Sequence, residues 1–146
     1  MLKIITFRDP GSAILFRPTK KIESFDKKLK KIAHDMENTL LGVDGIGLAA
    51  PQVGIGLAVC AIKSGKSVKI YCNPEITKAS REKHKMEEGC LSFPNVFLDI
   101  NRSKTVTVKY QNLTGKKKKI EAAGLLARAL QHEIDHLSGV AFIERV

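Results

Sequence analysis

Gln131-His132-Glu133-Ile134-Asp135-His136-Leu137 is the stretch around which the rest of this 146-residue chain is organised. It places two histidines four residues apart, with a glutamate directly after the first. In a helix, residues at this spacing lie one above the other, so both imidazoles can reach one metal ion while Glu133 stands about 100° further round. That geometry suits a metal-activated water with a carboxylate base. The alternative is a pair of hydrogen-bonded core histidines that match a short pattern by chance.

The surrounding residues predict that this stretch is helical. With a helical period, the segment 125–138 shows two apolar stripes, which the two histidines and Glu133 extend. The opposite stripe is polar and consists of Arg128, Gln131, Asp135 and Ser138. Gly124 and Gly139 bracket the segment, and Gly139 is well placed to cap its C-terminus. Ionisable groups on the buried side of a helix are costly unless something satisfies them, and a metal ion would do so.

The length and composition predict a single domain, residues 1–146, of ordinary globular character. The chain has 43% hydrophobic and 27% charged residues, values typical of globular proteins. No apolar run approaches the ~20 residues that span a bilayer, and the N-terminus lacks a signal-peptide core and cleavage site. We therefore expect a cytoplasmic protein with no membrane segment.

The net charge of +10 favours polyanionic surroundings such as RNA or an anionic membrane surface. Lys116-Lys117-Lys118-Lys119 supplies a large part of that charge. No aromatic residues are interleaved with these lysines as in a platform for stacking bases, so the pattern favours a solvated hairpin over a dedicated nucleic-acid site.

The N-terminal part of the chain predicts an extended arm followed by an amphipathic helix. Residues 1–23 are punctuated by prolines and a glycine. Ser24 resembles an N-cap, and an apolar stripe then recurs at helical spacing, formed by Phe25, Leu29, Ile32, Met36 and Leu40. His34 falls on the opposite, lysine-rich face, where we expect it to be solvated, and we also place His84 at the surface.

The middle of the chain predicts antiparallel strands. We expect strands over 56–62 and 68–72, with Asn73-Pro74 ending the second, and a clear alternating strand over 104–110 that returns over 118–122. Together these elements predict an α+β fold: antiparallel β-sheets packed around a central C-terminal helix that carries the two histidines, plus the N-terminal helix.

Three cysteines without paired spacing make a disulfide framework improbable on composition. Cys60 and Cys72 lie in strand-like segments and are expected to act as small hydrophobes. Cys90 lies in a polar, glycine-flanked setting and is the best candidate for a third metal ligand. Three protein ligands would leave one position for water, which distinguishes a catalytic site from a structural one.

Three segments resemble the signature motifs of the peptide deformylases, in the order found in that family. They are Gly45-Ile46-Gly47-Leu48-Ala49-Ala50-Pro51-Gln52, Glu88-Gly89-Cys90-Leu91-Ser92 and His132-Glu133-Ile134-Asp135-His136. The resemblance covers nearly the whole chain. Three complete motifs together are far more specific than any one of them.

The resemblance implies a metallohydrolase of protein biosynthesis that removes the formyl group from N-formylmethionyl nascent peptides. Cys90, His132 and His136 would bind one divalent metal, usually Fe²⁺ in the family, with Ni²⁺, Co²⁺ or Zn²⁺ as substitutes. A metal-bound water would lose a proton to Glu133, attack the formyl carbon, and the proton would pass to the departing amine.

The resemblance also assigns the groups around the substrate. The Gln52 side-chain amide and the Leu91 backbone N–H would stabilise the oxyanion. The strand edge Gly45 to Gly47 would pair with the peptide backbone. Four residues would line the methionine pocket: Ile46, Glu88, Leu125 and Ala129. For Glu88, an ion pair with Arg102 is an equal alternative to substrate contact.

Some positions depart from the family pattern. Asn95 stands where many relatives have glycine, Phe97 stands where some carry a basic residue, and Arg128 occupies a position that is apolar in some. The chain ends at Val146, soon after the third motif, so we do not expect the C-terminal helix with which many bacterial relatives dock on the ribosome. We expect instead a transient electrostatic contact with the ribosome, and a monomer.

Two other hypotheses of function use the same residues. The first is a zinc peptidase or other amidohydrolase, for which Cys90 would be an uncommon ligand. The second is a basic ribosome- or RNA-binding protein with a structural metal, which would need a fourth ligand from Cys60, Cys72 or His84.

Overall fold

The computed structural model covers residues 1–146 and contains two α-helices and seven β-strands. Five strands form an antiparallel sheet in the order β1-β2-β3-β6-β7, and β4 pairs with β5 in a second sheet. The strands are β1 Gly47–Ala49, β2 Val59–Ser64, β3 Ser67–Ala79, β4 Lys83–Cys90, β5 Phe93–Ser103, β6 Thr105–Gln111 and β7 Lys117–Ala123. The helices are α1 Lys27–Leu41 and α2 Gly124–Leu137, with short 3-10 helices η1 Ser12–Phe16, η2 Ala50–Val53 and η3 Phe142–Arg145.

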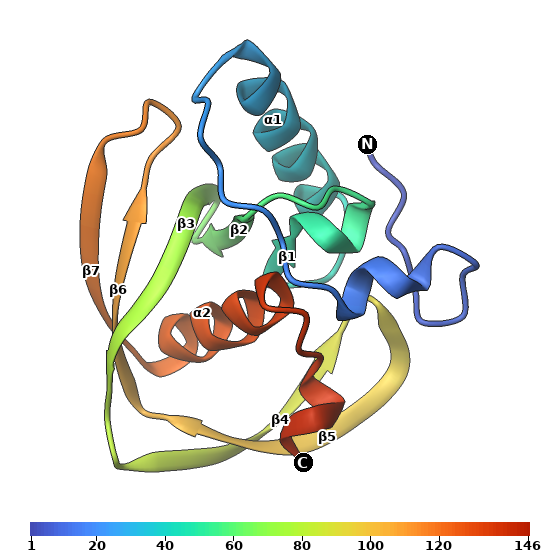
Figure 1. Cartoon of the computed structure of the whole chain (residues 1–146). Helices are drawn as coiled ribbons and strands as arrows, with labels where there is room; N and C mark the ends of the chain where they lie inside the picture. The colour runs from blue at the N-terminus through green and yellow to red at the C-terminus, as the bar shows by residue number, and fades with distance from the viewer.

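Helix α2 occupies the centre of the molecule, between the five-stranded sheet and the β4–β5 hairpin (Figure 1). Its residues Ala127, Leu130 and Leu137 are buried in one cluster with Val108 and Tyr110 of β6. The expected α+β fold with antiparallel sheets around a C-terminal helix is therefore confirmed. No helix of the structure combines the length and the apolar character that a membrane span requires.

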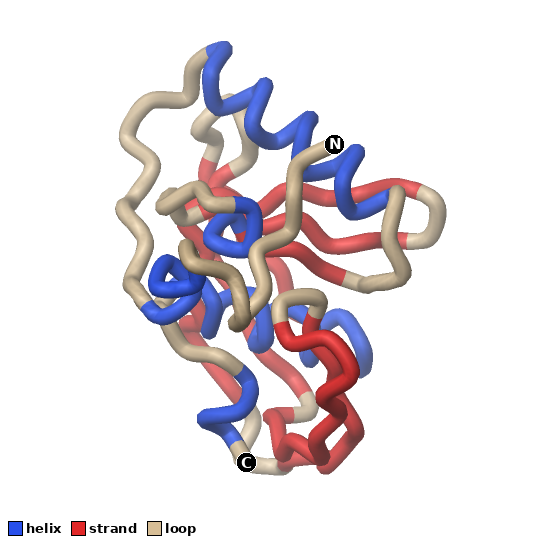
Figure 2. The backbone as a smooth tube through the Cα atoms, turned by 90° about the vertical axis from the view of Figure 1, so that its right-hand side faces the viewer, coloured by secondary structure: helices blue, strands red, loops and turns tan.

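The two helices lie on opposite faces of the five-stranded sheet. Along β2, Cys60 and Ile62 belong to the α2 cluster, whereas Val59 and Ala61 belong to the cluster of α1. This alternation is the two-residue period of a strand that is buried on both faces. Figure 2 shows α1 lying along the strands on its side of the sheet.

Helix α1 begins two residues later than its sequence predicts. The N-cap is Asp26, not Ser24, and the Asp26 carboxylate accepts a hydrogen bond from the Leu29 N–H at 3.0 Å. Aspartate and serine are comparable caps, so local preference alone does not separate these positions. The apolar stripe is correct, because Leu29, Met36 and Leu40 are buried against the sheet. His34 and His84 are exposed, as expected.

Strand β3 runs straight through the predicted stop at Asn73-Pro74, so that expectation is wrong. The register with β6 shifts between Cys72 and Glu75, and Asn73 adopts a φ of 49°. A bulge of this kind takes Pro74 out of the regular ladder, where its missing N–H would otherwise cost a hydrogen bond. The Asn73 side chain also accepts from the Ile22 N–H at 2.8 Å, which ties the N-terminal arm to the bulge.

The N-terminal arm is irregular apart from η1, and it packs against the end of α2. The Thr19 N–H donates to the Leu137 carbonyl at 2.9 Å. Gly139 follows the helix with a φ of 79°, and its N–H donates to the His136 carbonyl at 3.0 Å, as predicted for a C-terminal cap. A Cβ built on Gly139 would lie 2.8 Å from the Arg17 carbonyl carbon. The close approach of the arm therefore requires glycine here.

We predict that Gly139→Ala destabilises the fold more than Gly124→Ala. Both glycines have positive φ values, 79° and 61°, but nothing lies within 4 Å of a Cβ at Gly124. Gly124→Ala should therefore cost only the left-handed backbone penalty of about 1–2 kcal/mol. Gly139→Ala adds a clash with the backbone of Phe16 and Arg17, which would have to shift, so we expect roughly twice that loss or more. Denaturant unfolding of both variants measures the difference, and equal losses would contradict the account of the arm.

Candidate active site

The structure brings Cys90, His132 and His136 together. Cys90 ends β4, and the two histidines lie one turn apart on α2. Their ligating atoms all lie within 4.8 Å of one another, and Cys90 Sγ lies 3.3 Å from His136 Nε2. One sulfur and two imidazole nitrogens at this separation fit a single divalent transition-metal ion.

The orientation of His132 is set by Glu88. The Nδ1 atom of His132 lies 2.9 Å from Glu88 Oε1, which leaves Nε2 for a metal. The same carboxylate accepts two hydrogen bonds from Arg102, at 2.6 and 3.0 Å. Burial disfavours the charged carboxylate, but the hydrogen bonds from His132 and Arg102 outweigh it and lower the pKa of Glu88 to about 2. Glu88 is thus held as an anion by an ion pair, one of the two roles expected from sequence.

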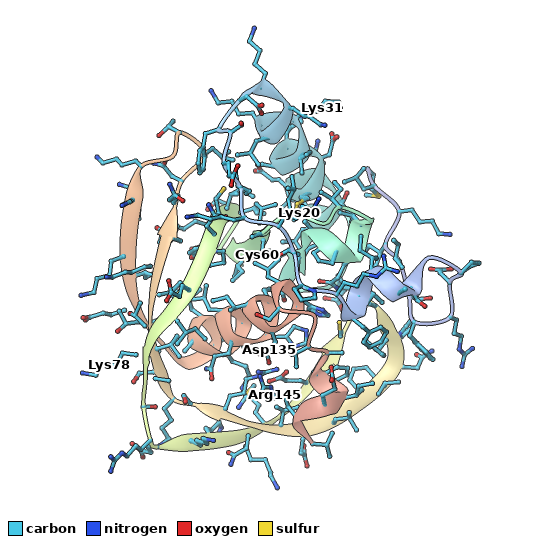
Figure 3. The ribbon with its side chains drawn as sticks, viewed as in Figure 1. Lys20, Lys31, Cys60, Lys78, Asp135 and Arg145 are labelled. Carbon is cyan, nitrogen blue, oxygen red and sulfur yellow. The ribbon has the colours of Figure 1, made fainter.

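The ion pairs continue along α2 to the C-terminal segment. Arg102 also donates to Asp135 at 3.0 Å, and Asp135 accepts from Arg145 at 2.8 Å. Figure 3 shows Asp135 and Arg145 close together below α2. On the other side of His132, the Phe142 ring lies 5.7 Å from the imidazole, measured between centroids. The segment after α2 therefore packs against the helix that carries His132 and His136, through Phe142 and Arg145.

Arg128 is not on a solvated polar stripe, which corrects the sequence-based expectation. Its residue surface is only 7% exposed, and its guanidinium donates to Glu88 and to the Ile100 carbonyl. Helical periodicity identifies which residues share a face but not what covers that face. Here the β4–β5 hairpin covers it and supplies a buried carboxylate, so an arginine can be accommodated.

Glu133 and His136 are buried groups with unpartnered atoms. Glu133 Oε1 and His136 Nδ1 have no hydrogen-bond partner in the protein. Burial raises the pKa of Glu133 to about 7 and lowers the pKa of His136 to about 3. A carboxyl group that titrates near neutrality is suited to accept and return a proton, and a neutral imidazole is suited to bind a metal.

Gln52 points its amide towards the same group of residues. Its Oε1 accepts from the Ala49 N–H at 2.9 Å, which fixes the amide orientation. Its Nε2 then lies 3.2 Å from Ser92 Oγ and 3.6 Å from Cys90 Sγ. Ser92 stands in the second motif, but the motif alone predicts no role for its side chain. The Ser92 hydroxyl is fully buried, and it lies nearer to the Gln52 Nε2 atom than the Cys90 sulfur does.

A cleft of about 690 Å³ opens onto these groups. It is lined by the catalytic and substrate residues that the sequence predicts, namely Gly45, Ile46, Gly47, Gln52, Glu88, Cys90, Leu91, Leu125, Ala129, His132 and Glu133. His136 is the one predicted site residue that does not line the cleft, and it is fully buried. Strand β1 is the edge of its sheet and pairs only with β2, so its other edge is unpaired.

The positions that depart from the family pattern also line this cleft. Asn95 has a φ of 64°, a left-handed conformation that asparagine tolerates better than most residues. Asparagine can therefore adopt the backbone conformation that this position requires. Phe97 lies beside it with 64% of its surface exposed, and makes that side of the cleft apolar.

Comparison with known proteins decides the family. The family model described as polypeptide deformylase matches residues 1–146, the whole chain. This chain belongs to the peptide deformylase family. The peptide deformylase of Thermotoga maritima is 44% identical over 146 residues, which is 100% of this chain and 87% of that protein. Peptide deformylase 1 of Bacillus subtilis is 47% identical over 135 residues, 91% of this chain and 84% of that protein.

Solved structures agree with this assignment. The crystal structure of the Thermotoga maritima peptide deformylase superimposes with a TM-score of 0.94 and covers 100% of this chain and 97% of that one. Peptide deformylases are metal-dependent hydrolases that remove the N-formyl group from nascent peptides. The activity expected from the resemblance is therefore confirmed at the level of the family, and it decides against a non-enzymatic RNA-binding protein. Cys60, Cys72 and His84, the fourth ligands which that reading needs, are not part of the metal-ligand group.

We predict that Gly47→Ala impairs deformylation. A Cβ at Gly47 would lie 2.6 Å from Glu133 Oε2 and 3.0 Å from its Cδ, so the Glu133 carboxylate would have to move. A displacement of about 1 Å at a reacting group can cost on the order of 100-fold in rate. Formate release from a formyl-Met-Ala peptide measures this loss. Gly56→Ala is the matched control, because nothing lies within 4 Å of a Cβ there. Full activity of Gly47→Ala would show that Glu133 is not constrained by β1.

Proposed function

We propose that residues 1–146 act as one catalytic domain that removes the formyl group from N-formylmethionyl peptides, with Cys90, His132 and His136 as metal ligands and Glu133 as the base. The observation that carries this proposal is the cluster of three ligating atoms within 4.8 Å of one another, next to a buried carboxyl group and at the wall of a cleft. A family model that spans residues 1–146 supports a single catalytic domain.

The donor set fits one divalent ion, and we propose Fe²⁺, with Ni²⁺, Co²⁺ or Zn²⁺ able to replace it. A thiolate with two imidazoles is suitable for any of these ions. When bound, such an ion supplies Lewis acidity: it lowers the pKa of a water molecule and polarises a carbonyl group. The ligand residues would hold it with two imidazoles oriented from one helix, and Glu88 would fix the imidazole of His132.

Glu133 would carry the proton through the reaction. The attacking water forms a C–O bond with the formyl carbon, and its proton passes to the Glu133 carboxylate. When the C–N bond breaks, Glu133 returns that proton to the leaving amine, so the products are formate and a peptide with a free N-terminus. The raised pKa of Glu133, about 7 because of burial, suits a group that must do both near neutral pH.

Gln52 and Leu91 would stabilise the charge that develops on the formyl oxygen. The Gln52 amide is held by Ala49 and points its Nε2 towards Cys90, and Leu91 directly follows Cys90. A preorganised donor of this kind typically contributes about 3 kcal/mol to the transition state.

The cleft would hold the peptide by its backbone and by its first side chain. The unpaired edge of β1, together with Gly45 and Ile46, which directly precede this strand, would add the peptide as a further strand. Three residues, Ile46, Leu125 and Ala129, would form the apolar wall of the methionine pocket. Glu88 would form part of that wall without contacting the substrate through its charge. Its carboxylate oxygens already accept hydrogen bonds from arginine and histidine side chains.

We further propose that the enzyme acts in the cytoplasm as a monomer and contacts the ribosome transiently. Lys109 lies directly opposite Lys119 on neighbouring strands, and with a net charge of +10 this surface would attract RNA phosphates.

We predict that Glu133→Gln strongly reduces the rate of formate release while the metal stays bound. The amide cannot accept the proton of the attacking water, so we expect a loss of at least about 100-fold, the lower range for general base catalysis. Formate release from formyl-Met-Ala and metal content after anaerobic purification are measured together. Glu23→Gln, an exposed position, is the control. An active Glu133→Gln enzyme would overturn the mechanism.

We predict that Glu88→Gln weakens metal binding about 10- to 100-fold, the usual effect of losing a partner of a metal-binding histidine. The variant removes the anion that orients His132 and leaves Arg102 and Arg128 without their shared partner. Competition with a chelator measures the affinity. The control is Glu87→Gln, because Glu87 is exposed and, unlike Glu88, forms no ion pair with Arg102, Arg128 or His132. Equal metal affinities of the two variants would mean that Glu88 does not position His132.

A further inference from the structure

Arg128 places a buried cation in the wall of the cleft that the proposed mechanism does not use. It lines the cleft together with Leu125 and Ala129, its neighbours on α2. Its Nη1 group donates to Glu88 and to the Ile100 carbonyl, and its Nη2 group donates to the His84 carbonyl. The guanidinium is thus fixed by three acceptors on the β4–β5 hairpin.

The Arg128 guanidinium has N–H donors that form no hydrogen bond within the protein. Arginine carries five N–H donors, and the three contacts of Arg128 account for three of them. Its Nε–H has no hydrogen-bond acceptor in the protein. The only buried side-chain atoms without a partner are Glu133 Oε1 and His136 Nδ1, so the Nε atom of Arg128 is not fully buried. The Nε atom therefore reaches accessible space, and Arg128 is a lining residue of the cleft.

The charge of Arg128 is also in excess. Glu88 is already paired with Arg102 through two hydrogen bonds, and Asp135 is shared by Arg102 and Arg145. The network therefore holds three arginines and two carboxylates, with a surplus of one positive charge. The cleft is also lined by apolar side chains, including Ile46, Met86, Leu125 and Ala129, and by the exposed carboxylate of Glu87. A cation with free donors among apolar groups favours a ligand group that accepts hydrogen bonds.

We propose that Arg128 is a specificity-determining residue that lets the cleft accept formyl peptides whose first side chain ends in a strong hydrogen-bond acceptor. This inference rests on the proposed function. The substrate class is the oxidised form of the usual one, N-formylmethionine sulfoxide peptides. A sulfoxide has the same chain as methionine with one added oxygen, which is a strong acceptor where the thioether is a weak one. The guanidinium would donate to that oxygen, while the carbon chain keeps its apolar contacts.

The test compares formate release from three peptides that differ only in the first side chain: formyl-methionyl-alanine, its sulfoxide and its norleucine analogue. The quantity measured is the ratio of kcat/KM for the sulfoxide to kcat/KM for norleucine. A ratio within one protein cancels differences in folding and metal content between variants. We expect this ratio to fall about 10- to 100-fold in Arg128→Met, the range for losing a hydrogen bond to a charged group.

Two further variants complete the experiment. Arg128→Lys keeps the charge but loses the planar fork, and we expect a smaller fall of the same ratio. If Arg128→Met fails to fold, the lysine variant still decides the question. Arg81→Met, at an exposed arginine, should leave the ratio unchanged. An unchanged ratio in active Arg128 variants overturns the role of Arg128 and leaves the proposed function intact. Failure of the unmodified enzyme to release formate from any of the peptides overturns the proposed function and this inference together.

Discussion

The structure depends on one constraint: the buried side of α2 carries three ionisable side chains that must be satisfied away from water. His132, Glu133 and His136 are each less than 9% exposed. Burying such groups without partners costs several kcal/mol for each charge. The protein provides a partner for His132, namely Glu88, but it provides none for Glu133 Oε1 or His136 Nδ1. The His136 nitrogen that faces Cys90 is Nε2, so a metal ion shared with Cys90 would leave Nδ1 unpaired. The unpaired Glu133 oxygen, on a residue that lines the cleft, is the atom that indicates a fold adapted to accept a further group.

The two sheets have different parts in satisfying this constraint. The five-stranded sheet supplies the apolar surface against which α2 packs, and β1 at its edge brings Gln52 to the site through η2. The β4–β5 hairpin supplies the chemistry, because Glu88, Cys90 and Arg102 all lie on it. The segment after α2 adds Phe142 against His132 and Arg145 against Asp135. The site is therefore assembled from parts of the chain that are far apart in sequence, and the central helix is the one element that all of them contact.

The sequence predicts the chemical parts of this arrangement better than the architecture around them. The spacing of His132 and His136 predicts a shared ligand because helix geometry is local, and Cys90 is predicted because its setting is unlike that of Cys60 and Cys72. The sequence does not predict the bulge at Asn73-Pro74, because whether proline ends a strand depends on the partner strand β6. Nor does it predict the burial of Arg128, since the acceptors of this side chain lie on the β4–β5 hairpin, 28 to 44 residues away in sequence. The hairpin itself carries charged and glycine residues that give little strand signal, and its pairing follows from contacts across the chain.

The most direct test of this account is X-ray absorption spectroscopy of the protein purified without oxygen. If α2 and β4 form one metal site, the bound ion should show one sulfur and two imidazole nitrogens, at ~2.3 Å and ~2.0–2.1 Å when the ion is Zn²⁺, with at least one position not filled by protein. The Cys90→Ser variant should lose the sulfur contribution. A spectrum with no sulfur ligand, or with four protein ligands, would contradict the claim that Cys90, His132 and His136 form an open catalytic site.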